Sequence, residues 1–390
     1  MIKLLAIIIG FSFVGADAHS RAISVEEMRL YDKIVDYSPY QNEVTCYNKS
    51  FRFKKLRWIQ RRSRDFRLVG PLSEFILYQT EKFTVGHYDY LVDDNGSVAD
   101  FSNIQDALDA SRDGDRIYVC PGTYKEKIDI ATDVDLIGLA GADRTRIDAS
   151  SLGDGTVVFL GSSALIEGFT ITGAKADSSC FYGGGIKISG HSSSGIIYQT
   201  PIVRNNKIID NTACKVGSIF VGGFSSGSSS AAVYNTATIQ NNIITGNYSG
   251  TSNTGGISVS CSKSIDTVIE NNVIAYNSAY SGNAGIELTG SGCTTYIRNN
   301  ILFNNTSSGT QNVITGSGGV IEYNNSYGNS TDYTSGTANI NVDPVFVDED
   351  DYELDSTSPS IDAGDPDPAY DDTDGSVNDQ GAYGGNNGNW

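Results

Sequence analysis

The sequence is poor in the residues on which most catalytic and metal-binding motifs depend. Its 390 residues include only 3 histidines, 2 tryptophans and 8 prolines, and no Cys-x-x-Cys spacing occurs. Basic residues are also scarce, since 27 Lys and Arg stand against 46 Asp and Glu, and the formal net charge is -19. No Lys or Arg follows Arg298. This charge argues against nucleic acid as a partner, and the missing cysteine spacing argues against a zinc site.

Long apolar runs are missing too, apart from a short one at the N-terminus. Lys3 precedes an apolar stretch from Leu4 to Val14, and Ala16-Asp17-Ala18 follows as a small-residue cleavage pattern. This arrangement is typical of a secretory signal peptide over residues 1–18. No later run reaches the roughly 18 apolar residues that a membrane-spanning helix needs, so we expect a secreted or cell-surface protein without an integral membrane segment.

Glycine, by contrast, is abundant, and the chain contains internal repeats. With 43 glycines and 39% hydrophobic residues, the composition is typical of many short strands joined by tight turns. Five segments align on an apolar residue, an outward residue and an asparagine; they start at Val203, Ile239, Ile269, Ile297 and Ile321, between 24 and 36 residues apart. This period predicts one solenoid coil for each repeat.

A second motif recurs between these segments, in which apolar residues alternate with outward positions. It is seen in Gly185–Ile188, Ser218–Val221, Gly256–Val259 and Gly285–Leu288. Alternation of this kind predicts half-buried strands. Stacked coils would place the inward Ile and Val residues in continuous columns.

The Asn-Asn doublets of the first motif predict the bends between strands. Asparagine tolerates the left-handed conformation, and its amide can bond the asparagine of the next coil in a ladder. The residues directly before the turns would form an outward column of Arg204, Gln240, Glu270, Arg298 and Glu322. Opposite charges on neighbouring coils would then make an exposed ion-pair ladder of small energy.

Six cysteines in an exported chain permit disulfides. Cys180 and Cys214 precede equivalent strands, and Cys261 and Cys293 follow equivalent strands, so each pair could face across adjacent coils. Cys46 and Cys120 remain, and they could tie the N-terminal segment to the first coil.

One stretch resembles a known family. The run from Ile104 through Gly114-Asp115 to Pro121-Gly122-Thr123-Tyr124 is similar to the opening coil of secreted pectate-lyase-like proteins. The resemblance implies an all-β fold, a right-handed parallel β-helix, and we expect about eight to ten coils, with Ile104, Ala107 and Leu108 on a short helix that closes one end of the core.

The end of the chain carries a second resemblance. Asp343–Phe346, Ser358–Asp365 and Asp374–Gly385 look like the choice-of-anchor Q module of bacterial secreted β-helix proteins, which implies an extracellular or surface life. We therefore divide the chain into a signal peptide (1–18), an N-terminal α/β or irregular segment (19–86), a parallel β-helix (87–342) and an acidic C-terminal cap (343–390).

The β-helix resemblance implies a polysaccharide site on the outward face. A lyase needs a base for the C5 proton of a uronic acid and a group that neutralises its carboxylate. Lys187 and Arg204 could fill these roles, with Glu287 and Arg298 binding substrate. Calcium could assist, with Glu167, Glu270 or Glu287 available as ligands.

Paired carboxylates offer a hydrolase as another hypothesis, in which Asp210, Glu270 and Glu287 approach one another across coils. The acidic tail could bind calcium irregularly through Asp365, Asp367, Asp372 and Asp374, although Tyr370 and Gly381 occupy EF-hand ligand positions and exclude that motif.

Known motifs narrow the choice of activity. The chain contains neither the Asp-Pro-His-Glu stretch of alginate epimerases, nor the polygalacturonase motif set, nor the Gly-x-x-Asp-Phe-x-Phe-Gly pattern of pectin methylesterases. The sequence thus predicts a monomeric extracellular β-helix that binds or cleaves a polysaccharide, with a calcium-assisted lyase preferred over a glycoside hydrolase if it is an enzyme. The alternative is a non-catalytic surface, adhesion or structural protein.

Overall fold

The computed structural model describes residues 89–95, 99–175, 182–190, 195–223, 231–250, 254–260, 266–291 and 294–388. It also gives the backbone of four strands nearer the N-terminus, which form two antiparallel pairs: β1 (Asn42–Cys46) with β2 (Lys49–Phe53), and β3 (Phe66–Val69) with β4 (Ile76–Gln79). The predicted signal peptide lies outside the described residues.

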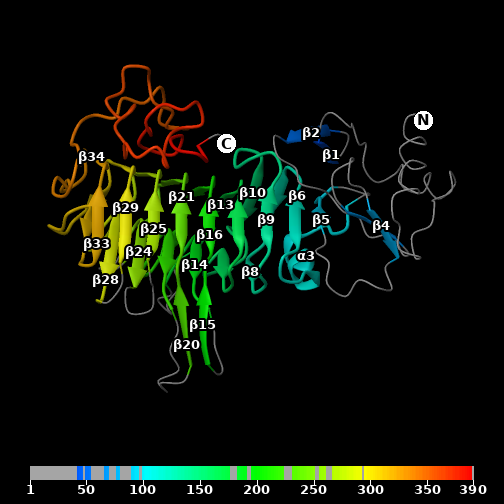
Figure 1. Ribbon diagram of the computed structural model, residues 1–390. Helices are drawn as coiled ribbons and strands as arrows, with labels where there is room; N and C mark the ends of the chain where they lie inside the picture. The colour runs from blue at the N-terminus through cyan, green and yellow to red at the C-terminus, as the bar shows by residue number, and fades with distance from the viewer. Residues whose placement is uncertain are drawn as a thin grey trace.

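The main body is a parallel β-helix with three long sheets, as the repeats predicted (Figure 1). Sheet 1 contains nine strands: β5 (Asp89–Val92), β6 (Arg116–Val119), β9 (Asp135–Gly138), β12 (Leu165–Glu167), β16 (Ile202–Arg204), β21 (Thr238–Gln240), β25 (Thr267–Glu270), β29 (Thr295–Arg298) and β33 (Gly319–Glu322).

Sheets 2 and 3 follow sheet 1 in each coil. Sheet 2 contains eight strands: β7 (Gly122–Tyr124), β10 (Thr145–Asp148), β13 (Thr170–Thr172), β17 (Lys207–Ile209), β22 (Ile243–Thr245), β26 (Val273–Ala275), β30 (Ile301–Phe303) and β34 (Asn325–Tyr327). Sheet 3 contains seven: β8 (Ile128–Ile130), β11 (Val158–Leu160), β14 (Ile186–Ile188), β19 (Ile219–Val221), β24 (Ile257–Ser260), β28 (Ile286–Thr289) and β32 (Ile314–Thr315). The nine strands of sheet 1 and the eight of sheet 2 agree with the expected eight to ten coils, whereas sheet 3 has seven strands.

Two smaller sheets arise from the connections. A four-stranded sheet joins β18 (Thr212–Ala213), β23 (Tyr248–Ser249), β27 (Ser278–Ala279) and β31 (Thr306–Ser307). A two-stranded parallel sheet pairs β15 (Gly195–Gln199) with β20 (Ala231–Asn235) and projects from the body (Figure 1). We call this pair the arm.

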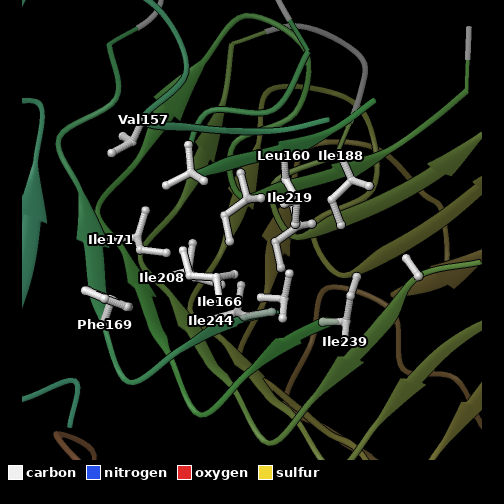
Figure 2. Packing of buried hydrophobic residues seen from close by; sticks show 14 of the residues in the cluster. Val157, Leu160, Ile166, Phe169, Ile171, Ile188, Ile208, Ile219, Ile239 and Ile244 are labelled. Carbon is white, nitrogen blue, oxygen red and sulfur yellow. The ribbon is translucent and has the colours of Figure 1, made fainter. Parts of the chain in front are cut away.

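The core is the stack of inward side chains that the alternation predicted. Ile166, Ile171, Ile188, Ile208 and Ile239 converge in the interior (Figure 2) and are fully buried. Each coil adds another layer of such residues, and burying one Ile or Leu side chain contributes roughly 2 kcal/mol.

The predicted short helix closes the N-terminal end of this stack. Helix α3 (Ile104–Ala110) buries Ile104, Ala107 and Leu108, as expected. Its N-cap is Asn103, whose side chain accepts a hydrogen bond from the Asp106 amide. Asparagine is among the residues that cap helices best.

The Asn-Asn doublets form the predicted ladder between sheets 1 and 2. At each step one asparagine donates its backbone and side-chain N–H groups to the Oδ1 of the next coil's asparagine at 2.8–3.2 Å. The rungs are Asn206, Asn242, Asn272, Asn300, Asn324 and Asn339. The residue directly before each rung adopts the left-handed conformation instead, as at Asn271 with a φ of 51°.

A second ladder, which the sequence reasoning missed, follows sheet 2. Its rungs are linked by the same pair of hydrogen bonds at 2.9–3.1 Å. They are Asn211, Asn247, Asn277, Asn305 and Asn329. Two buried polar ladders therefore fix the register of the coils, since a slip of one residue would leave every rung without its partner.

Residues 343–388, which we call the tail, fold back along the side of the β-helix over sheet 2 (Figure 1). The outward residues Ile243, Val273 and Ile301 of sheet 2 are buried in a second apolar cluster with Tyr352 and Ala382 of the tail. The tail therefore covers an apolar outer surface that would otherwise face water.

Two cysteines in the described region, Cys120 and Cys214, are disulfide-bonded. Cys180, Cys261 and Cys293 lie outside the described residues. The pairs Cys180–Cys214 and Cys261–Cys293 consequently stay predictions.

Candidate functional site

The outward column predicted on sheet 1 is present in register. Arg204 pairs with Gln240, Gln240 with Glu270, Glu270 with Arg298, and Arg298 with Glu322 along neighbouring strands. Glu167 extends the column by one coil on the other side of Arg204. We call these six residues the ion-pair column.

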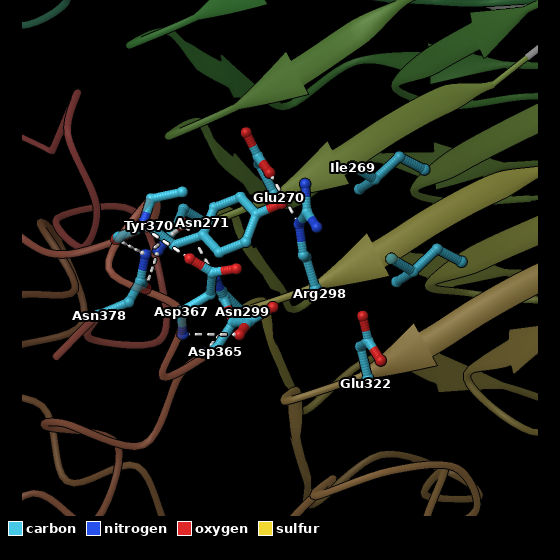
Figure 3. Close-up of polar contacts among 12 residues, drawn as sticks. Ile269, Glu270, Asn271, Arg298, Asn299, Glu322, Asp365, Asp367, Tyr370 and Asn378 are labelled. Atoms are coloured by element: carbon cyan, nitrogen blue, oxygen red, sulfur yellow. Dashed lines mark hydrogen bonds and ion pairs between the residues drawn. The ribbon is translucent and has the colours of Figure 1, made fainter.

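Within this column the charges neutralise one another. Arg204 donates from Nε and Nη2 to Glu167 Oε2 at 3.0 and 2.9 Å, and Arg298 donates from Nε to Glu270 Oε2 at 3.0 Å (Figure 3). The Arg298 guanidinium also lies 4.0 Å from the centre of the Tyr370 ring in the tail. Partly exposed pairs of this kind are worth about 0.2–1 kcal/mol each, so the column stabilises the fold modestly.

The left-handed asparagines beside the column hold the tail. Asn271 Nδ2 donates to Asn378 Oδ1 at 2.9 Å, and Asn299 Oδ1 accepts from the Asp365 amide at 2.9 Å (Figure 3). Asn241 Nδ2 donates to the carbonyl groups of Ala382 and Gly384 at 3.0 and 2.7 Å. In these three doublets the two asparagines thus have separate roles, because the first docks the tail and the second forms the ladder.

The four aspartates proposed as calcium ligands lie in turns of the tail. Asp365 and Asp367 each accept a hydrogen bond from an amide two residues later, and Asp374 does the same with Ser376. Burial, with the charge of Asp379 adding to it, raises the pKa of Asp372 to about 6. In the described part of the chain, no three His, Cys, Asp or Glu side chains are placed to hold a metal ion, so we assign no reaction step to calcium.

Polar groups also surround a cleft of about 360 Å³ between sheet 2 and the tail. Lys207 Nζ lies 2.6 Å from Asp143 and 2.5 Å from Asp351. Burial alone would lower the pKa of Lys207, but the hydrogen bonds to these two carboxylates raise it. The lysine therefore joins the tail to the β-helix rather than serving as a base.

Sheet 3 presents a different outward column. Each strand turns one residue outward, and the strand register stacks these residues coil by coil. In order along the solenoid they are Asp129, Phe159, Lys187, Phe220, Ser258, Glu287 and Thr315. We call them the sheet 3 column; adjacent members are about 4.8 Å apart.

Aromatic and basic side chains gather around the middle of this column. Lys187 Nζ lies 5.5 Å from the Phe159 ring centre, and the rings of Phe220 and Tyr182 are 4.8 Å apart. Lys215 Nζ lies 4.1 Å from the Tyr182 ring centre and 3.0 Å from its hydroxyl. Among the described residues neither lysine has a carboxylate partner.

The residues predicted for catalysis and binding are thus divided between two sheets. Lys187 and Glu287 share the sheet 3 column, three coils apart. Arg204, Glu270, Arg298 and Glu167 belong to the ion-pair column of sheet 1. The structure therefore does not bring Lys187 together with Arg204, nor Glu270 with Glu287.

Sequence reasoning missed the aromatic members of the site. The aligned strand motifs already placed Lys187, Phe220, Ser258 and Glu287 at one position, so the outward column could have been written directly from them. Tyr182 and Lys215 could not be found in this way, because they lie in connections before the strands.

No helix in the described part of the chain is long and apolar enough to cross a membrane. Residues 202–365, less than half of the chain, match the model of a family described as disaggregatase related. No curated protein matches the chain.

Solved structures of pectin methylesterases are among those similar to the chain. The pectin methylesterase from carrot is 15% identical, with 67% of this chain and 90% of that chain covered and a TM-score of 0.27. The deglycosylated pectin methylesterase from Aspergillus niger is 16% identical, with 70% and 92% covered and a TM-score of 0.29. The likeness concerns the fold alone, which is a parallel β-helix.

Proposed function

We propose that this protein is an extracellular binder of acidic polysaccharide and that the sheet 3 column is its binding face. The observation that carries the proposal is the in-register run of Phe159, Lys187 and Phe220, with Tyr182 and Lys215 beside it. The family match described as disaggregatase related includes Lys215, Phe220 and Glu287 of this face.

The chemistry of this face suits a chain of sugar rings. Phe159 and Phe220 are two coils apart, or roughly 10 Å, which would let two rings of an extended polymer pack on aromatic surfaces. Aromatic rings offer a large apolar area for this contact. Lys187 and Lys215 lie between and beside these rings, where they would pair with carboxylates of uronic acid residues.

Beyond Phe220 the column changes to hydroxyl and carboxyl groups. Ser258 is followed by Glu287, which accepts a hydrogen bond from the Thr254 hydroxyl at 2.5 Å. Ser258 is buried, so Glu287 is the group of the two that would bond sugar hydroxyls. The bound polymer would therefore have a preferred direction, with its acidic residues near the lysines.

The net charge of -19 opposes binding of an acidic polymer, but distant charges are screened beyond a Debye length of about 10 Å at 0.1 M salt. Local contacts with Lys187 and Lys215 then decide the affinity. Binding should weaken as salt is raised, because exposed ion pairs are screened first.

The geometry supports binding better than cleavage. A lyase would need Lys187 as base close to a group that neutralises the substrate carboxylate, and Arg204 lies on another sheet, paired with Glu167. The second cation at the sheet 3 column is Lys215, which lies beside the Tyr182 ring. The calcium-assisted lyase remains a separate hypothesis, with Lys187 as its base.

Affinity electrophoresis through gels that contain an acidic or a neutral polysaccharide tests the proposal. We expect retardation by the acidic polymer, an approximately tenfold weaker interaction for Phe220→Ala, and a loss of salt dependence for Lys187→Ala combined with Lys215→Ala. The matched control is Arg204→Ala, which removes a positive charge from sheet 1 and should leave retardation unchanged. Equal retardation of all variants would contradict the proposed face.

The same proteins separate binding from cleavage and test calcium. Absorbance in the unsaturated-uronate band, followed with and without calcium, should stay flat if the protein only binds. A calcium-dependent rise that Lys187→Ala abolishes would establish the lyase instead. A secreted or cell-surface location is part of the proposal, because the polymers concerned are extracellular.

A further inference from the structure

One strand of the arm, β15, has little cover. Strands β15 and β20 pair in parallel over five residues, from Gly195 with Ala231 to Gln199 with Asn235. They form a separate two-stranded sheet that projects beyond the ends of the main strands (Figure 1). Parallel sheets are normally buried on both faces, and two strands alone are marginally stable in water.

Three consecutive side chains of β15 are exposed: Ile196, Ile197 and Tyr198 are 54%, 39% and 66% exposed. Because successive residues of a strand point to opposite faces, both faces of β15 show apolar surface. On β20, by contrast, Val233 and Asn235 are buried. The rings of Tyr198 and Tyr234 stack with their centres 5.5 Å apart.

In the described part of the chain, strand β15 pairs with β20 alone, and Ile196, Ile197 and Tyr198 have no strand on their other side. The preceding coil passes from β11 to β12 through residues 161–164, which are too few to supply another strand. Proteins usually protect such edges with charged residues or proline, but neither strand of the arm contains any.

The base of the arm is held firmly. Gln199 Nε2 donates to the Gly161 carbonyl at 2.5 Å, and Asn235 Nδ2 donates to the Gly222 carbonyl at 2.5 Å. Both donors are buried. The open edge is therefore presented in a fixed position, which reduces the entropy lost when a partner strand adds to it.

We propose that β15 pairs with β15 of a second copy of this chain and forms a four-stranded sheet across a two-fold axis. Antiparallel pairing centred on Ile197 places Ile196 opposite Tyr198 of the other copy, and Tyr198 opposite its Ile196. Aromatic and β-branched residues are favourable cross-strand pairs. The sequence of β15 is thus complementary to itself.

Charge favours this position for contact between two copies. The chain carries a net charge of -19, so two bodies repel, whereas the arms are uncharged and project away from the bodies. Screening by salt should therefore strengthen the dimer. This differs from the monomer expected from the sequence, and it does not depend on polysaccharide binding by sheet 3.

Sedimentation of the full chain over a range of concentrations tests the dimer. We expect a mass of twice the chain, with a dissociation constant that falls as salt rises. Tyr198→Lys and Ile196→Lys should each raise that constant at least tenfold. Tyr280→Lys is the matched control, because Tyr280 is 65% exposed elsewhere on the surface, and it should sediment as the wild type does.

Unchanged thermal unfolding of each variant shows that it is folded, since the substituted side chains are exposed. Hydrogen exchange adds an independent readout, in which the amides of Ile196–Tyr198 gain protection as concentration rises. A monomer at every concentration, or a dimer that both arm variants leave intact, would overturn the proposal. A loss of polysaccharide retention in Tyr198→Lys at unchanged mass would also overturn it and make the arm a sugar platform.

Discussion

The ladder between sheets 1 and 2 is tested most severely by replacing one of its asparagines, and Asn272 is the best residue to replace. Its side chain donates to the carbonyl groups of Ile239 and Glu270 at 2.9 Å and to Asn300 Oδ1 at 2.9 Å, and its Oδ1 accepts from the backbone and side-chain nitrogens of Asn242 at 3.0 Å. The residue is fully buried. Asn272→Ala therefore breaks five hydrogen bonds at a site from which water is excluded.

The expected cost follows from these contacts. A net contribution of about 1 kcal/mol for each bond, with the buried backbone N–H of Asn242 left unpaired while its Nδ2 keeps the carbonyl groups of Val203 and Gln240, gives a loss of about 4–5 kcal/mol in the free energy of unfolding. Denaturation by urea, followed by circular dichroism, measures the change. Because solenoids can unfold in parts, hydrogen exchange should show the loss centred on the coils of β21, β25 and β29.

The neighbouring Asn271 provides the control for this prediction. Asn271→Gly keeps the left-handed turn, since glycine adopts a positive φ freely, and it leaves the ladder intact. The two asparagines differ by one position in sequence and have unrelated contacts. A destabilisation of less than 1 kcal/mol by Asn272→Ala would refute the assignment of the ladder as a main support of the fold.

Three further predictions concern the tail and the ladders. Asn271→Gly removes the contacts with Asn378 and Asp379, so the amides of residues 365–385 should exchange faster while global stability changes by less than about 1 kcal/mol; unchanged exchange would mean that this amide does not hold the tail. Burial raises the pKa of Asp372 from 3.8 to about 6, so the docked tail favours the protonated acid, and this contribution is complete below pH 3.8 and is lost as the pH rises through 6. Protection of the tail, corrected for intrinsic exchange, should therefore fall between about pH 4 and pH 6.5, and Asp372→Asn should reduce that fall; a flat profile in the wild type would contradict the inference. The sequons at Asn247 and Asn305 coincide with ladder rungs that are 0% and 1% exposed, so mass spectrometry of folded protein from a glycosylating host should find neither asparagine modified, and a glycan on either would be incompatible with the second ladder.

Much of the fold could be predicted because its repeats are local in sequence. The Asn-Asn doublets marked the turns, and the residues before them gave the ion-pair column in the correct register. The second ladder was within reach as well, because each of its rungs follows a first-ladder rung by five residues, as Asn211 follows Asn206. Most rungs of the second ladder follow a residue other than asparagine, so they gave a weaker signal than the doublets.

The position of the tail was harder to predict, yet the sequence contained a trace of it. Outward residues of sheet 2 are polar where they pair with a charged group of the tail, as Lys207 does with Asp351, and apolar where the tail packs on them, as at Ile243 and Val273. Consecutive apolar residues such as Ile243-Ile244 break the alternation of a half-exposed strand. Such a break predicts a cover but cannot identify which segment provides it.

The candidate site was only partly predictable, because side chains on different sheets cannot be separated by residue type alone. Lys187 and Arg204 looked like a matched base and cation, but the turn of the coil between β14 and β16 places them on sheets 3 and 1. The arm was visible only as extra length, since the interval from Val203 to Ile239 is the longest between the aligned repeats.

The central claim is that sheet 3, rather than the charged column of sheet 1, binds polysaccharide. Hydrogen exchange with and without a saturating acidic polysaccharide tests it most directly, because both sheets are read in one experiment. We expect bound polysaccharide to slow amide exchange at β11, β14, β19 and the segment around Lys215. Exchange at β12, β16 and β21 should not change. Protection centred on the sheet 1 strands, or no change on sheet 3 while the polymer is bound, would contradict it.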